Sequence, residues 1–235
     1  MKIRGRRECT DCGHRWSYYD TGEVACPDCG SLRSTGVDER TEHTADPMTL
    51  DLTAARNRVD EGVLVAATEA AEQCREFVRR SGFIDGGDLQ PLSETFLAAA
   101  ELAAVAATLD RTMRVGDAEE LYLLSLLRGA DLDDRPGPAE VPDSLREPRA
   151  LAYASAVADY RSDLRTWLDD HPDPAASRVL QTLDEHVRRV EALDGAVSPA
   201  DSERLARAAQ DVGEYLRDGD ETRLATATGR LDEID

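Results

Sequence analysis

Apolar residues recur every three or four positions through most of the chain, a period that is typical of amphipathic α-helices. In residues 47–130 one apolar stripe runs from Val59 to Phe77 and a second from Leu92 to Met113. A shorter third stripe consists of Leu121, Leu124 and Leu127. The pattern predicts three helices in this first helical half.

Local signals suggest where these helices begin and end. Asp46-Pro47 is typical of an N-cap followed by proline at the first helical position, and Ser81-Gly82 is typical of a helix end. Asp117 and Glu120 have the spacing of a capping box. We therefore expect helices to start near residues 47 and 117.

Residues 131–148 contain four prolines and no periodic pattern, which predicts a long Pro-rich loop. Helical stripes resume in residues 149–235, the second helical half, where Asp173-Pro174 and Ser198-Pro199 mark two helix starts. No repeat near 34 or 40 residues is evident, so an irregular bundle is favoured over a solenoid. The expected total is about six or seven helices.

The first 46 residues have a different pattern. Short stretches at residues 3–9, 15–20 and 23–26 are predicted to be strands separated by turns. Residues 39–46 are polar and unpatterned, which predicts a linker. The predicted fold is a small N-terminal β ribbon in residues 1–38, followed by an all-α helical bundle.

Four cysteines give the ribbon its chemistry. Cys9-x-x-Cys12 and Cys26-x-x-Cys29 are separated by thirteen residues. Two such turns can present four thiolates to one tetrahedral ion, which predicts a Zn²⁺ site. With all four positions filled by sulfur, no position remains for a reactive water, so the metal is expected to be structural. A segment this short depends on such a metal for most of its folding free energy.

The strings CTDCGHRW and CPDCGS resemble the zinc-ribbon superfamily, which includes ribbons of archaeal basal transcription factors, RNA polymerase subunits and ribosomal proteins. The resemblance covers residues 1–36 and implies metal-ligand roles for Cys9, Cys12, Cys26 and Cys29. No cyclin-like repeat follows, unlike in the transcription factors. The layout of a ribbon before an acidic helical body also resembles an uncharacterised family of halophilic archaeal proteins of unknown function.

Iron is the less favoured metal. The Cys-x-x-Cys-Gly spacing also resembles the rubredoxin-like iron module of rubrerythrins, which is joined to a di-iron bundle that needs Glu-x-x-His pairs. The residues three positions before His43, His171 and His186 are Arg40, Leu168 and Leu183. An electron-transfer role for the helical part is therefore disfavoured.

Charge changes the picture of possible partners. The chain has 48 Asp and Glu against 28 Lys and Arg, a net charge of −20, and residues 1–40 are neutral overall. This acidic, lysine-poor composition is similar to that of proteins from archaea with molar internal salt. At about 1 M salt the Debye length is near 3 Å, so charge alone cannot recruit nucleic acid. A protein partner is favoured over nucleic acid.

Nucleic acid or a partner could still contact the ribbon through a set of basic and aromatic side chains: Arg4, Arg6, Arg7, Arg15, Trp16 and Tyr18. Arginine beside aromatic residues is typical of surfaces that stack on bases. The interpretation that we favour for the aromatic residues is packing in the small ribbon core.

The remaining cysteine and two of the histidines are expected to have no functional role. Cys74 lies on a helical stripe and is expected to be a buried core thiol. His14 and His186 are expected at the surface. No phosphate-binding loop, GxSxG elbow or HExxH pair occurs, which disfavours an enzyme. With neither a signal peptide nor an apolar run of membrane length, the protein is expected in the cytoplasm and not in a membrane.

The sequence thus predicts a non-enzymatic, zinc-binding adaptor or regulatory protein whose ribbon is tethered to an acidic helical interaction body. A nucleic-acid-associated ribbon linked to transcription or translation is the second hypothesis, and an iron electron-transfer module is the third. No feature of the sequence indicates an oligomeric state.

Overall fold

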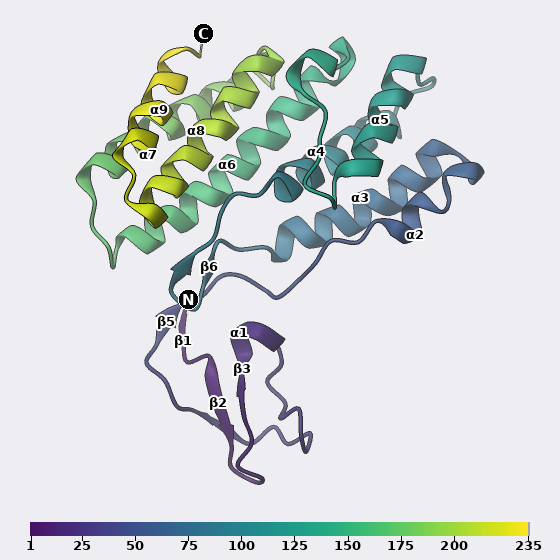
Figure 1. Ribbon diagram of the computed structural model, residues 1–235. Helices are drawn as coiled ribbons and strands as arrows, with labels where there is room; N and C mark the ends of the chain where they lie inside the picture. Colours follow the sequence, from purple (N-terminus) through teal and green to yellow (C-terminus); the bar gives the residue numbers. More distant parts are fainter. Residues whose placement is uncertain (235) are drawn as a thin grey trace.

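A strand-containing part and a larger helical body lie next to each other in the computed structural model, which describes residues 1–234 (Figure 1). The central strand of the small part is β2 (Arg6–Cys9), which pairs antiparallel with β3 (Arg15–Ser17) and β4 (Ser34–Gly36). Arg7 lies opposite Trp16 on one side and Gly36 on the other. A single turn of helix, α1 (Tyr18–Thr21), follows β3.

The strand expected at residues 23–26 is not formed. The Glu23 carbonyl accepts a hydrogen bond from the Trp16 indole at 3.0 Å, and the Cys26 N–H donates to the Ser31 carbonyl at 2.8 Å. These backbone groups are engaged in turns and are not free for a β ladder. The third strand of the sheet is β4, which follows the second cysteine pair.

Two further strand pairs connect the ribbon to the body. β1 (Lys2–Ile3) pairs with β5 (Thr41–Glu42), which lies inside the segment expected to be a linker. β6 (Ile84–Asp85) and β7 (Asp88–Leu89) form a hairpin whose turn residues, Gly86 and Gly87, both have positive φ. The predicted linker at 39–46 therefore contains a strand that is paired with the start of the chain.

The helical body contains the elements α2 (Thr53–Arg56), α3 (Val63–Arg80), α4 (Glu94–Leu109), α5 (Asp117–Gly129), α6 (Arg146–Leu168), α7 (Pro174–Ala192), α8 (Pro199–Asp218) and α9 (Glu221–Asp232). Three short 3₁₀ turns accompany them: η1 (Val59–Glu61), η2 (Pro138–Glu140) and η3 (Asp143–Leu145). Within residues 1–234, seven of the helices have twelve or more residues, α3 to α9. The predicted fold class, a β ribbon followed by an all-α bundle, is confirmed.

Helix starts follow the sequence signals in some places and not in others. Pro174 and Pro199 occupy first helical positions, behind the N-caps Asp173 and Ser198, as predicted. The start expected at Asp46-Pro47 is wrong, because residues 43–52 form no helix or strand and α2 begins at Thr53. The capping box expected at Asp117 and Glu120 is also wrong, since Glu119 accepts from the Gly116 N–H at 2.6 Å.

Buried apolar side chains from both helical halves form one continuous core. α4 packs against α3 on one side and α6 on the other, and α6 packs against α8 (Figure 1). Phe83, just before β6, joins the halves, with its ring 5.0 Å from that of Phe96 and 4.7 Å from that of Tyr160.

The apolar face of α5 differs from the predicted one. The buried residues are Tyr122, Leu123, Leu126 and Leu127, whereas the side chain of Leu121 is 65 % exposed. Met113, expected on the stripe of the preceding helix, follows the end of α4 and is fully exposed. The outer face of α5 is thus partly apolar and faces solvent.

The ribbon is fixed to the body around Thr44. Its hydroxyl donates to Asp163 Oδ2 on α6 at 2.6 Å and accepts from the N–H groups of Phe83 and Ile84 at 3.1 and 3.0 Å. The N–H of Thr44 donates to the Ile84 carbonyl at 2.9 Å. Because these bonds join segments far apart in sequence, they hold the β5 end of the ribbon against the β6–β7 hairpin.

A methyl group at Gly82 is expected to disrupt this junction. A Cβ there would lie 2.3 Å from the Thr44 backbone, so Gly82→Ala must push the two segments apart. We expect a loss of about 1–3 kcal/mol in unfolding free energy and faster proteolysis between residues 39 and 46. Gly229→Ala in α9, where a Cβ meets open space, is the matched control. Equal resistance of both variants to urea and protease would contradict this account.

Candidate metal centre

The two cysteine pairs occupy turns with the same backbone hydrogen bonds. In the first, the Cys9 N–H donates to the His14 carbonyl and the Gly13 N–H to the Cys9 carbonyl, at 2.8 and 3.0 Å. In the second, Cys26 donates to Ser31 and Gly30 to Cys26, both at 2.8 Å. Gly13 and Gly30 have φ of +77° and +71°, a conformation that glycine adopts without the steric cost of a side chain. Each turn thereby aims two sulfurs in one direction.

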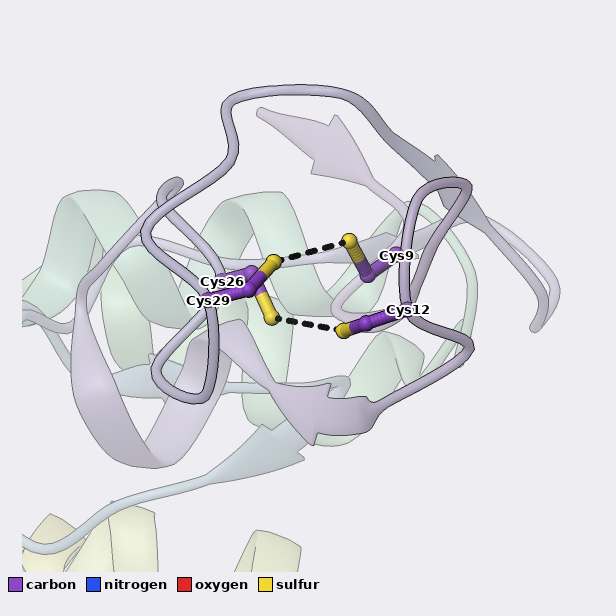
Figure 2. Close-up of side chains that lie close together, drawn as sticks. All are labelled: Cys9, Cys12, Cys26 and Cys29. Carbon is purple, nitrogen blue, oxygen red and sulfur yellow. Dashed lines mark hydrogen bonds between the residues drawn. The ribbon is translucent and has the colours of Figure 1, made fainter.

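The four sulfur atoms face one another across these turns (Figure 2). Their Sγ atoms all lie within 4.8 Å of one another. The Cys9–Cys29 and Cys12–Cys26 separations are both 3.6 Å. A tetrahedral ion with metal–sulfur bonds of about 2.3 Å requires sulfurs about 3.8 Å apart, whereas a disulfide requires about 2.05 Å. The spacing therefore fits a four-coordinate metal ion and not a pair of disulfides.

The thiols of the cluster shift one another's pKa. A hydrogen bond from the Cys12 N–H is the largest effect on Cys9 and lowers the pKa of its thiol to about 7. The His14 N–H acts to lower the pKa of Cys12, but burial and the neighbouring sulfurs raise it to about 12. Four adjacent thiolates repel one another, so the fully deprotonated set needs a positive ion among them.

Comparison with known proteins places the whole chain in one family. The model of a family of unknown function, DUF7117, matches residues 1–231. This protein belongs to the DUF7117 family. Searches of curated proteins and of solved structures each give no match. The match spans the ribbon and the helical body together.

The basic and aromatic residues predicted as contacts on the DUF7117 ribbon are not gathered on one surface. Trp16 is 8 % exposed and packs with Cys9 and Cys26 in the ribbon core, so it is not available to stack on a base. Tyr18 is half-buried, with its ring 6.1 Å from that of His43. Trp16 thus packs in the ribbon core, as favoured from the sequence, whereas Tyr18 lies outside that core, beside His43.

The arginines of this set also divide into two groups. Arg7 donates to Ser34 Oγ at 2.9 Å, and Arg15 donates to Glu8 Oε2 at 2.7 Å. Arg4 and Arg6 are exposed, and within residues 1–234 neither forms an ion pair. Within residues 1–234, Arg4 and Arg6 are the two arginines of the predicted contact set that are both exposed and without an ion-pair partner; Arg7 is half-buried and is hydrogen-bonded to a neutral hydroxyl.

The remaining candidates from the sequence lie away from the cysteine cluster. Cys74 is fully buried in the helical core, where desolvation raises the pKa of its thiol to about 12, as expected for an unreactive core cysteine. His14 is exposed, as expected. His43, which no sequence signal marked, is buried beside Tyr19, with ring centroids 4.7 Å apart, and accepts from the Gly86 N–H.

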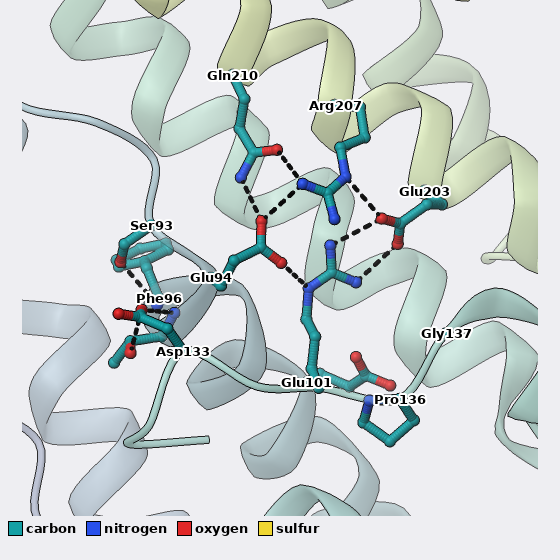
Figure 3. Close-up of polar contacts among 12 residues, drawn as sticks. Ser93, Glu94, Phe96, Glu101, Asp133, Pro136, Gly137, Glu203, Arg207 and Gln210 are labelled. Atoms are coloured by element: carbon teal, nitrogen blue, oxygen red, sulfur yellow. Dashed lines mark hydrogen bonds and ion pairs between the residues drawn. The ribbon is translucent and has the colours of Figure 1, made fainter. Parts of the chain in front are cut away.

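A second polar cluster, which sequence patterns did not reveal, lies inside the helical body (Figure 3). Glu101 on α4 is fully buried and accepts hydrogen bonds from the hydroxyls of Tyr122 and Tyr153. Arg149, also fully buried, donates to Tyr122 at 3.1 Å and to Glu203 at 2.9 Å. The cluster joins α4, α5, α6 and α8.

Arg135 extends this cluster into the Pro-rich loop. Its guanidinium donates two hydrogen bonds to Glu203, at 2.7 and 2.9 Å, and one to Glu94 at 2.7 Å. A bidentate arginine–carboxylate pair has a fixed geometry. The Pro-rich segment, which ends at residue 145 rather than at the predicted 148 because α6 begins at Arg146, is therefore anchored to α4 and α8 by charged groups. At its outer end the network reaches the surface, because Glu94, which accepts from Arg135, lines a hollow of about 400 Å³ together with Arg207.

No helix in the described part of the chain has both the length and the apolar character needed to cross a bilayer.

The Glu203 carboxylate should make the free energy of unfolding depend on pH in the acidic range. Burial acts to raise its pKa, but the hydrogen bonds and charge of Arg135 outweigh burial and lower it to about 2. The pKa of a glutamate in the unfolded chain is near 4.3. The contribution of Glu203 to the free energy of unfolding is therefore fully present above about pH 4.3 and is lost as the pH falls through about 2. The difference between the two pKa values corresponds to about 3 kcal/mol. We expect Glu203→Gln to flatten the fall in unfolding free energy between pH 5 and about 2.5.

Urea unfolding of both forms across this pH range, in constant salt, measures the effect. Glu191→Gln, at an exposed position on α7, is the control and should leave the wild-type pH dependence unchanged. Parallel pH curves for wild type and Glu203→Gln would show that Glu203 has no depressed pKa.

Proposed function

We propose that this DUF7117 protein is a non-enzymatic adaptor that holds one structural Zn²⁺ ion through Cys9, Cys12, Cys26 and Cys29 and binds another protein. The observation that carries the metal assignment is the spacing of the four Sγ atoms, with cross-turn separations of 3.6 Å. Zinc is favoured over iron because the helical body has no Glu-x-x-His pair for a di-iron partner site. When bound, the ion would cross-link the two cysteine turns and neutralise part of the negative charge of the four thiolates.

A structural role is supported by the donor set and by its position. Four thiolates fill a tetrahedral shell and leave no position for substrate or water. Cys9 and Cys26 are buried and pack with Trp16, so the ligands are part of the small ribbon core itself. The metal would therefore replace the apolar core that a segment of about 40 residues cannot build alone.

A protein partner is supported by charge. The helical body carries the whole net charge of −20, since residues 1–40 are neutral, and such a surface repels phosphate. On the ribbon, Trp16 is buried and Arg15 is paired with Glu8. The nucleic-acid alternative would depend on Arg4 and Arg6.

Metal content tests the assignment. We expect the purified, colourless protein to contain one zinc ion per chain by elemental analysis. Cys26→Ser should lose the metal and unfold residues 1–38 while keeping the far-ultraviolet circular dichroism of the helices, because the helical core is separate from the ribbon core. Cys74→Ala should keep the metal. Visible iron–thiolate absorption, or full metal content in Cys26→Ser, would contradict the proposal.

Binding of nucleic acid separates the two partner hypotheses. We expect the zinc-loaded full chain to show no saturable binding to DNA or RNA oligonucleotides in high salt, because its net charge is repulsive. Fluorescence anisotropy measures this. Saturable binding that Arg4→Ser/Arg6→Ser removes, and that Arg178→Ser on α7 does not, would support the nucleic-acid hypothesis instead.

A further inference from the structure

The outer face of α5 is the most exposed apolar region of the helical body. Three side chains are the most exposed large apolar groups among residues 47–234: Met113, Leu132 at 67 % and Leu121 at 65 %. Leu121 lies on α5. Met113 lies four residues before the start of this helix, and Leu132 lies three residues after its end. Exposed apolar side chains gathered at one element indicate an interaction surface rather than scattered surface residues.

One stripe of α5 has an ordered sequence of charge and apolar groups. Asp117, Leu121, Leu124 and Arg128 follow one another at spacings of four, three and four, which places them within about 60° on the helix. Asp117 and Arg128 are both exposed, and within residues 1–234 neither forms an ion pair. The stripe therefore has an unpaired negative end, an apolar middle and an unpaired positive end.

The stripe also borders a hollow. Between α5 and the α2–η1 segment lies a groove of about 420 Å³, lined by Val59, Leu121, Leu124 and Leu127 and by the polar residues Arg56, Ser125 and Arg128. The charge of Arg56 is compensated by Asp131, to which it donates two hydrogen bonds. The groove thus has an apolar floor and one uncompensated positive charge, at the Arg128 end. Figure 1 shows α5 and α2 at the edge of the bundle, with no further helix outside them.

We propose that two copies of the chain pair through this face, with their α5 helices antiparallel. In that arrangement Leu121 of one copy faces Leu124 of the other, and Asp117 faces Arg128. The stripe is complementary to itself, because a twofold axis between Leu121 and Leu124 brings opposite charges together at both ends. The same axis brings the segment before one α5, with Met113, next to the segment after the other, with Leu132. A second copy therefore covers Leu121 and pairs the charges of Asp117 and Arg128 without a foreign partner.

This dimer is independent of the metal site, which lies in the ribbon. Its first test is the mass of the zinc-loaded full chain by sedimentation equilibrium, in a salt concentration that keeps the helical circular dichroism unchanged. We expect a concentration-dependent monomer–dimer equilibrium. Leu121→Asp should weaken association by at least about a hundredfold, because it places a charge in the apolar middle of the contact. Leu193→Asp, at an exposed position at the end of α7, is the control and should associate as the wild type does.

Charge reversal tests the antiparallel register. Asp117→Arg and Arg128→Asp should each weaken association by about tenfold, since each puts like charges together at both ends of the stripe. The double variant Asp117→Arg/Arg128→Asp should recover wild-type association, because its charges pair again. Each single reversal also opposes the helix dipole of α5, and those costs add in the double variant, so recovery cannot come from helix stability.

Mixing provides a second readout. The two single variants should associate with each other more tightly than either does with itself, because one stripe is then wholly positive and the other wholly negative. A monomer at every concentration would overturn the proposal. So would a dimer that Leu121→Asp leaves intact, or a double variant weaker than both single variants.

Discussion

Four sulfur atoms that converge from two turns are the constraint on which the ribbon depends. Each turn has the same two backbone hydrogen bonds and a glycine of positive φ, and each supplies only two of the four sulfur ligands. The buried side chains of this part are Cys9, Trp16 and Cys26, too few to hold a fold without a cross-link. A metal ion is the cross-link that fits sulfurs spaced at 3.6 Å.

The two parts of the protein are stabilised by different interactions. The ribbon relies on its sulfurs, while the body buries one continuous apolar core in which a charged cluster fixes the relative positions of α4, α5, α6 and α8. Buried ion pairs add little net stability compared with apolar packing, but they penalise any arrangement that separates the partners. We infer that the Glu101, Arg149 and Glu203 cluster specifies how the two helical halves pack, and that Thr44 specifies how the ribbon joins them.

Local sequence signals predicted the parts of this structure that depend on local geometry. The Cys-x-x-Cys turns and the starts at Pro174 and Pro199 depend on a few adjacent residues, and all are found where expected. The buried face of α5 was missed because Leu121, Leu123, Leu124, Leu126 and Leu127 supply two apolar stripes, and only contact with α3 and α4 selects between them. The Glu101 cluster was missed because its members are separated by up to about a hundred residues and share no motif.

In the proposed function, a metal-stabilised ribbon is joined through Thr44 to an acidic helical body that binds another protein. The central claim is that all four cysteine sulfurs bind one ion. X-ray absorption at the zinc edge of the purified protein tests this most directly. We expect a first shell of four sulfur atoms at about 2.3 Å; nitrogen or oxygen in that shell, or fewer than four sulfurs, would rule out a four-cysteine site.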